Sequence, residues 1–242
     1  MKKNYENPVQ KEYARLAQKY DDKWDFYIQT TLQKSMQNLE LHAGECLLDI
    51  GCGTGRLLEA IEKKYPDVIL SGIDISQEML DIAGKRLSKK THIERSEAEK
   101  LPFAAEKFDV IVLGNMFHYI REPMLALKEM MRVLKPGGRI VITDWCNDYI
   151  SCQVYGLVLR VFNQAHCKTY KKRECYQLLY SSGFDDIKIE SYKINWFWGL
   201  MTATARKKPL YGGTTMVRDP ICCVELDPRN VFSTNLYRRV NG

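Results

Sequence analysis

The sequence predicts an α/β fold in which a mostly parallel sheet carries helices on both faces. Short apolar runs, which are typical of buried strands, alternate along the chain with longer segments of helical periodicity. The clearest unit joins an apolar run at 46–50 to a helical pattern through a turn with three glycines at alternate positions. Because a helix that follows a strand leads back to a parallel neighbour, this alternation predicts a sheet of that kind.

The turn at Gly51, Gly53 and Gly55 is the stretch around which the chain is organised. Glycine takes positive φ at little cost and lets the backbone approach a ligand closely. The free N–H groups of the helix that starts there suit a carboxylate or a phosphate. Asp49 stands two residues before the first glycine, and the pattern differs from the G-x-G-x-x-G spacing of dinucleotide sites. A purely structural turn is the alternative interpretation.

Residues 1–40 precede this unit and are predicted to be helical. Apolar and aromatic residues recur at intervals of three and four over 9–20 and again over 24–39, which predicts two helices with a break at 20–23. The pair would either pack on the core or cover the site. We interpret 1–40 as an N-terminal helical lid.

Residues 41–206 are predicted to form the main domain. Pro66 ends its first helix, and Ser76 caps its second. Asp74 stands at the end of the second strand, at the edge where open α/β sheets bind ligands. The predicted helices span 55–64, 76–87 and 123–134, and the predicted strands span 46–50, 68–73, 91–96, 108–115 and 140–144.

The C-terminal part adds a helix, a hairpin and a tail. A segment at 149–165 has helical periodicity but is apolar nearly all round, so another element must cover it. A helix at 171–182 ends at Gly183, and strands at 184–192 and 194–205 would complete a seven-stranded sheet whose last strand is antiparallel. Residues 207–242 lack a clear periodicity, and their six basic and three acidic residues contribute +3 to the net charge of +6. We expect an irregular basic tail there.

The composition disfavours several classes of protein. Outside the tail the chain is only mildly basic, so its charge does not indicate a nucleic-acid partner. The eight cysteines include no C-x-x-C pair, which favours reduced thiols over a metal site. The N-terminus lacks the apolar core of a secretory signal, and no apolar stretch reaches the roughly 20 residues of a membrane span. We therefore expect a soluble, cytoplasmic protein without a bound metal.

Four segments, in this order, resemble the class I S-adenosylmethionine-dependent methyltransferases that act on small molecules: 49–55, Asp74, 97–103 and 134–138. The first motif of this family is similar to D-I-G-C-G-T-G of this chain. The family's D-A-x-x-L-P-F segment is similar to E-A-E-K-L-P-F, and its R-V-L-K-P-G-G turn is similar to L-K-P-G-G. The resemblance covers about residues 40–205 and implies a Rossmann-like fold with S-adenosyl-L-methionine as the cofactor. The departures are Glu97 in place of the family's Asp and the additional tail.

The resemblance also implies which residues bind the cofactor. Asp74 would accept hydrogen bonds from two ribose hydroxyls, although an acid that caps a helix is the alternative. Glu97 would receive the adenine amino group, unless it is simply solvated. The implied cofactor-binding residues are Asp49, Gly51, Cys52, Gly53, Gly55, Asp74, Ile75, Met79, Glu97, Ala98 and Asn115.

Catalysis would need little from the side chains, because the sulfonium already activates its methyl group. A general base is required only for an acceptor that must lose a proton. His118, which follows the fourth strand, is the candidate catalytic residue, and a structural histidine is the alternative. Asp144 and Tyr149 are further options for a base.

The acceptor is predicted to be a small, apolar or aromatic molecule. The chain lacks both the N/D-P-P-Y motif of nucleic-acid amino methyltransferases and the Pro-Cys nucleophile of cytosine C5 enzymes. We expect residues 145–170 to form a cap on the acceptor pocket. Aromatic residues that fit such a pocket, though core packing would also explain them, are Trp145, Tyr149, Tyr155, Phe162, Trp196, Phe197 and Trp198.

Two other functions remain open from the sequence. A non-catalytic protein that retains the cofactor pocket would show the same motifs. A nicotinamide-dependent oxidoreductase is disfavoured by the spacing of the glycines. No motif indicates the oligomeric state or the accepting atom.

Overall fold

The computed structural model describes residues 8–154, 156, 168–209, 217–218 and 225–226. Residues Met1–Lys208 form one compact unit and Pro209–Gly242 a second, and each is described by itself. Most of the segment predicted as a helix at 149–165, and most of the predicted tail, lies outside the described residues.

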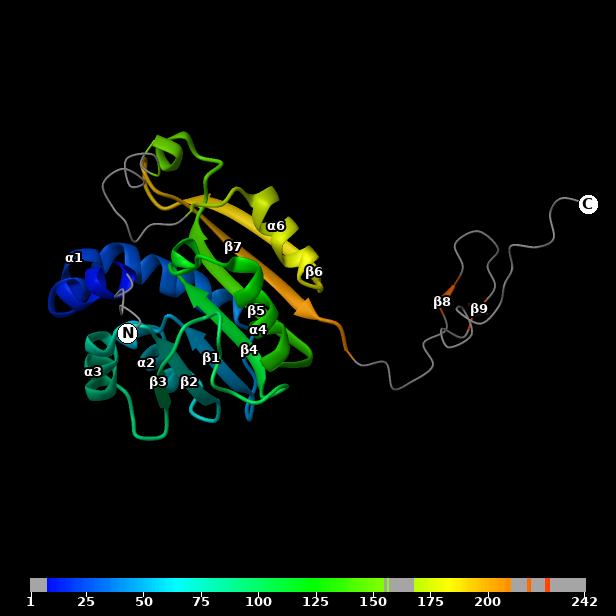
Figure 1. Ribbon diagram of the computed structural model, residues 1–242, viewed down its shortest axis with the longest axis horizontal. Helices are drawn as coiled ribbons and strands as arrows, with labels where there is room; N and C mark the ends of the chain where they lie inside the picture. Colours follow the sequence, from blue (N-terminus) through cyan, green and yellow to red (C-terminus); the bar gives the residue numbers. More distant parts are fainter. Residues whose placement is uncertain (1–7, 155, 157–167, 210–216, 219–224, 227–242) are drawn as a thin grey trace, which may run out of the picture. The chain divides into compact units, whose positions relative to one another are not determined.

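A seven-stranded sheet in the order β3-β2-β1-β4-β5-β7-β6 forms the centre of the first unit (Figure 1). Strands β1 to β5 pair in parallel, whereas β7 is antiparallel to both of its neighbours. The predicted seven-stranded, mostly parallel sheet with an antiparallel last strand is therefore confirmed. The strands are β1 Cys46–Ile50, β2 Ile69–Asp74, β3 His92–Arg95, β4 Phe108–Gly114, β5 Leu134–Trp145, β6 Phe184–Lys193 and β7 Gly199–Lys207.

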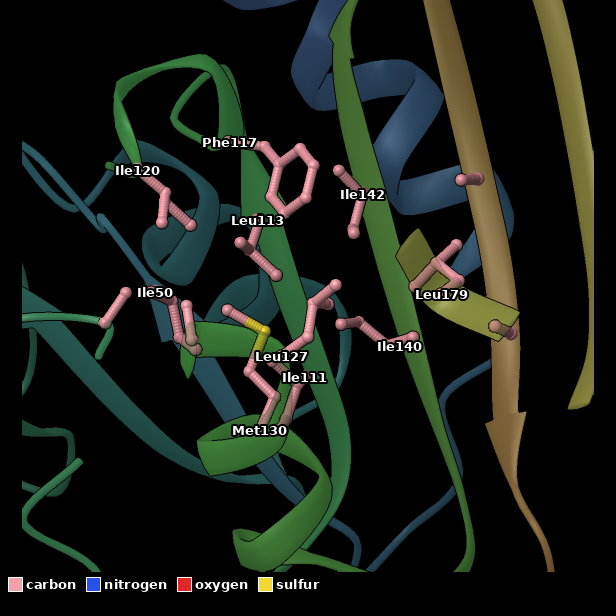
Figure 2. Close-up of a cluster of buried hydrophobic side chains, with 14 of the residues drawn as sticks. Ile50, Ile111, Leu113, Phe117, Ile120, Leu127, Met130, Ile140, Ile142 and Leu179 are labelled. Atoms are coloured by element: carbon pink, nitrogen blue, oxygen red, sulfur yellow. The ribbon is translucent and has the colours of Figure 1, made fainter. Parts of the chain in front are cut away.

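Helices cover both faces of this sheet, because the central strands are apolar on both sides. Ile111 and Leu113 of β4 join a cluster with α4 and α6, and Figure 2 shows them beside Leu127 and Met130 of α4. Val110 and Val112 join a second cluster with α2 and α3. The helices are α1 Pro8–Asn38, α2 Arg56–Lys64, α3 Gln77–Arg86, α4 Pro123–Val133 and α6 Lys172–Ser181, and a short 3-10 helix, η1, spans Phe117–Tyr119.

The predicted break near residue 20 in the N-terminal helices is wrong, because α1 runs without interruption from Pro8 to Asn38. The polar residues that suggested a loop include Asp21, whose carboxylate is bound by the rest of the protein. It accepts hydrogen bonds from Thr54 Oγ1 at 2.8 Å and from Arg86 Nη2 at 2.6 Å. Asp21 is thus a contact residue within one continuous helix.

A buried arginine fixes the chain just beyond the C-terminal end of α1. Arg139 of β5 donates to the carbonyl oxygens of Leu39 and Glu40 and forms a two-pronged ion pair with Glu45. Such paired N–H···O bonds add geometric specificity as well as energy. They join the end of α1 to the residues that lead into β1.

Two strands begin five or six residues away from the positions that the sequence predicts. Strand β5 begins at Leu134 rather than at 140, because Leu134 pairs with Phe108 before the register shifts. Strand β7 begins at Gly199 rather than at 194. Here the Asn195 side chain accepts the N–H groups of Phe197 and Trp198, which holds a turn before the strand.

The second unit contains one described element, a short antiparallel pair of β8 Val217–Arg218 with β9 Glu225–Leu226. The rest of the predicted basic tail lies outside the described residues. Among the described residues, no helix is both long enough and apolar enough to cross a membrane.

The first prediction concerns a chain that ends at Lys208. The sheet is complete at that point, because Lys207 ends β7 and its ammonium donates to the carbonyl oxygens of Met131 and Leu134. We expect truncation to change the free energy of unfolding by less than about 1 kcal/mol, or the Tm by less than about 4 °C. Scanning calorimetry on the two chains tests this. Aggregation of the shortened chain, or a larger fall in Tm, would show that the second unit supports the first.

Candidate active site

The turn after β1 takes the backbone form that its glycines predict. The φ angles of Gly51, Gly53 and Gly55 are 73°, 54° and 80°. The N–H groups of Gly51 and Cys52 both donate to the carbonyl oxygen of Ile73, at 2.8 and 2.9 Å. The turn is therefore tied to the end of β2.

Asp74, the last residue of β2, completes this tie. Its Oδ2 accepts the N–H of Gly53 at 2.9 Å, and its Oδ1 accepts the N–H of Ser76 at the start of α3, also at 2.9 Å. Burial raises the pKa of Asp74, and the amides of Ser76 and Gly53 oppose that shift. A carboxylate oxygen accepts more than one hydrogen bond, so each oxygen retains capacity for a ligand.

A cavity of about 500 Å³ opens at this edge of the sheet. A Cβ at Gly53 would meet no heavy atom within 4 Å, so the turn borders open space there, whereas a Cβ at Gly51 would lie 2.8 Å from Met116 Cγ. Eight of the eleven predicted cofactor residues line the cavity, namely Gly51, Gly53, Asp74, Ile75, Met79, Glu97, Ala98 and Asn115.

The other three predicted cofactor residues lie elsewhere. Asp49 and Cys52 line a smaller cavity of about 80 Å³, which shares Gly51, Gly53 and Asn115 with the large one. Gly55 caps the start of α2, where a Cβ would lie 3.1 Å from Ala83 Cβ.

The Asp49 carboxyl is buried, and burial together with the neighbouring Asp74 raises its pKa to about 8. Burial likewise raises the pKa of the Cys52 thiol. Two acids within one buried region disfavour each other's ionisation. A positively charged group in this region would relieve that cost.

Helix α1 forms part of the cavity wall, which the sequence analysis did not specify by residue. Val9, Tyr13 and Tyr20 line the cavity from α1, and Tyr119 lines it from η1. The Tyr13 ring lies 5.5 Å from both the Tyr20 and Tyr119 rings, between centroids. The spacing of seven residues between Tyr13 and Tyr20, which places both on one helical face, was the available signal.

The rest of the lining combines apolar side chains with charges of mostly one sign. The apolar residues include Met116, Ile120 and the half-exposed Leu125. The acids are Asp74, Glu97, Glu99 and Glu122, with Arg121 as the basic residue among the lining groups. Glu97 is exposed at the cavity, so its side chain is accessible to a ligand.

His118, the predicted catalytic residue, is buried beside the cavity and is not among the residues that line it. Its Nδ1 lies 2.7 Å from Asp144 Oδ1, and its backbone N–H donates to Asp144 Oδ2 at 2.9 Å. The imidazole stacks on Trp145, with 5.0 Å between ring centroids. Its neighbour Tyr119 does line the cavity, and a catalytic role for His118 stays a prediction.

The described aromatic residues that the sequence predicts for an acceptor pocket lie outside the linings of these two cavities. Trp145 and Trp198 pack with Tyr27 and Leu200 in a separate apolar cluster, and Trp196 is 85% exposed. Neither of the two cavities is lined by a described member of the predicted aromatic set. Tyr155 and Phe162, which belong to the predicted cap, lie outside the described residues.

Comparisons with known proteins place this chain among methyltransferases. A family of methyltransferase domains matches residues 48–142. The chain is 34% identical over 118 residues to demethylmenaquinone methyltransferase of Lactobacillus johnsonii, which covers 46% of this chain and 48% of the relative. It is 30% identical over 142 residues to malonyl-acyl carrier protein O-methyltransferase of Marinomonas sp., which covers 58% and 52%. The chain thus spans about half the length of these curated relatives.

A solved structure extends the comparison to the whole fold. The S-adenosylmethionine-dependent methyltransferase of Thermotoga maritima aligns with a TM-score of 0.68 at 22% identity, over 83% of this chain and 100% of that chain. This likeness shows a common fold.

The residues of the large cavity fit a nucleoside with a cationic side chain. Gly53 leaves its side of the turn open, and Asp74 offers acceptor capacity for hydroxyl groups. Ile75, Met79 and Ala98 supply apolar contacts. The excess of acids suits a ligand with a positive charge.

The second prediction follows from the raised pKa of Asp49. The unfolded chain loses this proton near the ordinary pKa of 3.8, whereas the folded chain keeps it until about pH 8. The folded state therefore loses relative stability as the pH rises from about 4 to 8. We expect Asp49→Asn to remove this loss, so that its stability relative to wild type improves by up to about 3–4 kcal/mol between pH 5 and 8.

Urea unfolding of both proteins at pH 5 and pH 8 measures this difference. Asp81→Asn, which changes an exposed acid of α3, is the matched control and should leave the pH dependence of wild type unchanged. Parallel stability profiles for Asp49→Asn and wild type would contradict the raised pKa.

Proposed function

We propose that this chain, a member of the class I S-adenosylmethionine-dependent methyltransferases, transfers a methyl group from S-adenosyl-L-methionine to a small acceptor. The observation that carries the proposal is the cavity of about 500 Å³ at the end of β1, β2 and β4. One part of it presents Asp74 and the open glycine turn, and another presents aromatic and aliphatic side chains. This combination serves a polar cofactor and an apolar acceptor together.

The cofactor, when bound, supplies an electrophilic methyl group on a sulfonium. The residues of this chain bind and orient it. Asp74 would accept the ribose hydroxyls, and Glu97 would accept the adenine amino group. The turn at Gly53 admits the ligand close to the backbone, because no side chain stands there.

Orientation would be the main catalytic contribution. Holding two reactants in line can supply about 7–11 kcal/mol of the barrier. Helix α1 and the segment 116–122 line part of the cavity and would shield a bound cofactor and acceptor from some of the solvent.

The proposed acceptor is a small apolar or aromatic molecule, and not a nucleic acid. Tyr13, Tyr119, Ile120 and Leu125 give one part of the cavity an apolar and aromatic surface. The names of the two curated relatives state different acceptors, a demethylmenaquinone and a malonyl-acyl carrier protein. The acceptor must therefore be argued from the cavity of this chain.

A base would matter only for an acceptor that loses a proton. His118 is the proposed base for that case, since a carboxylate at 2.7 Å from its Nδ1 would stabilise the imidazolium. This role requires a rearrangement that brings the buried ring to the cavity, because His118 does not line it in this structure. An acceptor with a free lone pair would need no general base. We propose a cytoplasmic location, where the described cysteines, which are all free, would stay reduced.

A screen with methyl-labelled S-adenosylmethionine tests the proposed activity. The panel should contain small quinols, phenols, amines and carboxylic acids. We expect label to appear in one class of small acceptor and S-adenosylhomocysteine to accumulate in equal amount. Cofactor binding without transfer to any member of the panel would favour a non-catalytic binding protein.

The third prediction concerns Asp74→Ala. Loss of a charged acceptor for two hydroxyl groups costs about 1.5–3 kcal/mol. The Kd for S-adenosylhomocysteine should therefore rise by about 10-fold to 100-fold, as measured by titration calorimetry. Asp81→Ala removes the same charge from the exposed face of α3 and should leave the Kd unchanged. An unchanged Kd in a folded Asp74→Ala variant would refute the ribose assignment.

A further inference from the structure

Asn115 has an unusual backbone conformation for a residue in a binding site. It follows β4 directly and has a φ of 57°, in the left-handed region that disfavours most side chains. Its N–H donates to the carbonyl oxygen of Thr143 in β5 at 2.8 Å. Because Asn115 lines both the large and the small cavity, the direction in which the chain leaves β4 shapes the site.

Helix α1 binds both polar atoms of the Asn115 side chain. Tyr27 Oη donates to Asn115 Oδ1 at 2.7 Å, and Asn115 Nδ2 donates to Thr31 Oγ1 at 2.8 Å. The Thr31 hydroxyl in turn donates to the backbone carbonyls of α1. Tyr27 and Thr31 are four residues apart and so share one face of the helix.

The Tyr27 phenol is itself held in place. The indole N–H of Trp145 donates to Tyr27 Oη. The Tyr27 ring packs against Trp198, with 5.8 Å between ring centroids. Burial raises the pKa of Tyr27 well above 10.0, so the phenol stays protonated and remains a donor to Asn115. The side chain of Asn115 is thus clamped from two positions on a rigid helix.

The hydrogen bonds that join Tyr27 and Thr31 to the Asn115 side chain form a clamp. This clamp acts on the part of the cavity that touches the glycine turn. Met116 follows Asn115 and packs so closely on Gly51 that a Cβ there would lie 2.8 Å from Met116 Cγ. A change in the conformation of Asn115 would shift Met116 against Gly51. Contacts of α1 with Thr54 and Arg86, made through Asp21, hold the same helix over the turn.

We propose that Tyr27 and Thr31 are positioning residues of the cofactor site, which act by clamping Asn115 in its left-handed conformation. Helix α1 is then a wall of the site whose position affects cofactor binding. The inference rests on the proposed function for its ligand, S-adenosylhomocysteine. It goes beyond that function because it assigns a positioning role to two residues outside the lining of the large cavity. Tyr27 lines neither cavity, and Thr31 lines only the small one.

The fourth prediction tests the clamp with matched variants. Tyr27→Phe and Thr31→Val each remove one hydrogen bond to Asn115, and each should raise the Kd for S-adenosylhomocysteine about tenfold. Tyr192→Phe is the control. It removes a phenol hydrogen bond of similar length, between Tyr192 Oη and Thr202 Oγ1 at 2.9 Å, from a residue that lines neither the large nor the small cavity. It should lower the Tm by a similar amount and leave the Kd within about twofold of wild type.

Two further variants separate positioning from stability. Thr31→Ser keeps the hydroxyl group and should restore the wild-type Kd. Asn115→Gly allows positive φ without a side chain to clamp, so adding Tyr27→Phe in that background should change the Kd no further.

Titration calorimetry with Tm measurements on the full chain distinguishes the outcomes. An equal rise in Kd for Tyr192→Phe, or an additive effect of Tyr27→Phe on Asn115→Gly, would overturn the clamp. A wild-type protein that does not bind S-adenosylhomocysteine would instead overturn the proposed function.

Discussion

The hydrogen bond between the Asp74 carboxylate and the Gly53 amide is the contact on which the site depends. The turn contains glycines with positive φ at three alternate positions, so its backbone could adopt many conformations. The bond at 2.9 Å, together with the two amides that share the Ile73 carbonyl, selects one of them. The same carboxylate reaches the start of α3 through Ser76. One acid therefore fixes the turn, begins a helix and faces the cavity.

Helix α1 supplies the second constraint, because it crosses the edge of the sheet where this turn lies. Its polar residues bind partners that are distant in sequence. Asp21 binds Thr54 and Arg86, Tyr27 binds Asn115, and Ser35 binds Thr143. Because these contacts are spread along one helix, together they set its position. Packing of the N-terminal helix therefore completes the wall of the cavity.

Local signals explain why much of the fold could be predicted from the sequence. The strand, glycine turn and helix at 46–64 depend on neighbouring residues, as does the Ser76 cap, whose hydroxyl accepts the Met79 N–H. The continuity of α1 could not be predicted, because Asp21 owes its place in a helix to partners 33 and 65 residues away. The cavity wall at Tyr13 and Tyr119 likewise depends on two elements that meet only in the folded chain. Trp145 and Trp198 looked suitable for a pocket because an aromatic composition does not distinguish a cluster in the core from a lining.

The central claim is that the turn, Asp74 and the cavity are built for S-adenosylmethionine rather than for a nicotinamide dinucleotide. Titration calorimetry of the wild-type chain with S-adenosylhomocysteine, and separately with NAD, tests this claim most directly. The account predicts saturable binding of S-adenosylhomocysteine at one site per chain and no heat of binding from NAD. Binding of NAD at that site, with no response to S-adenosylhomocysteine, would contradict it.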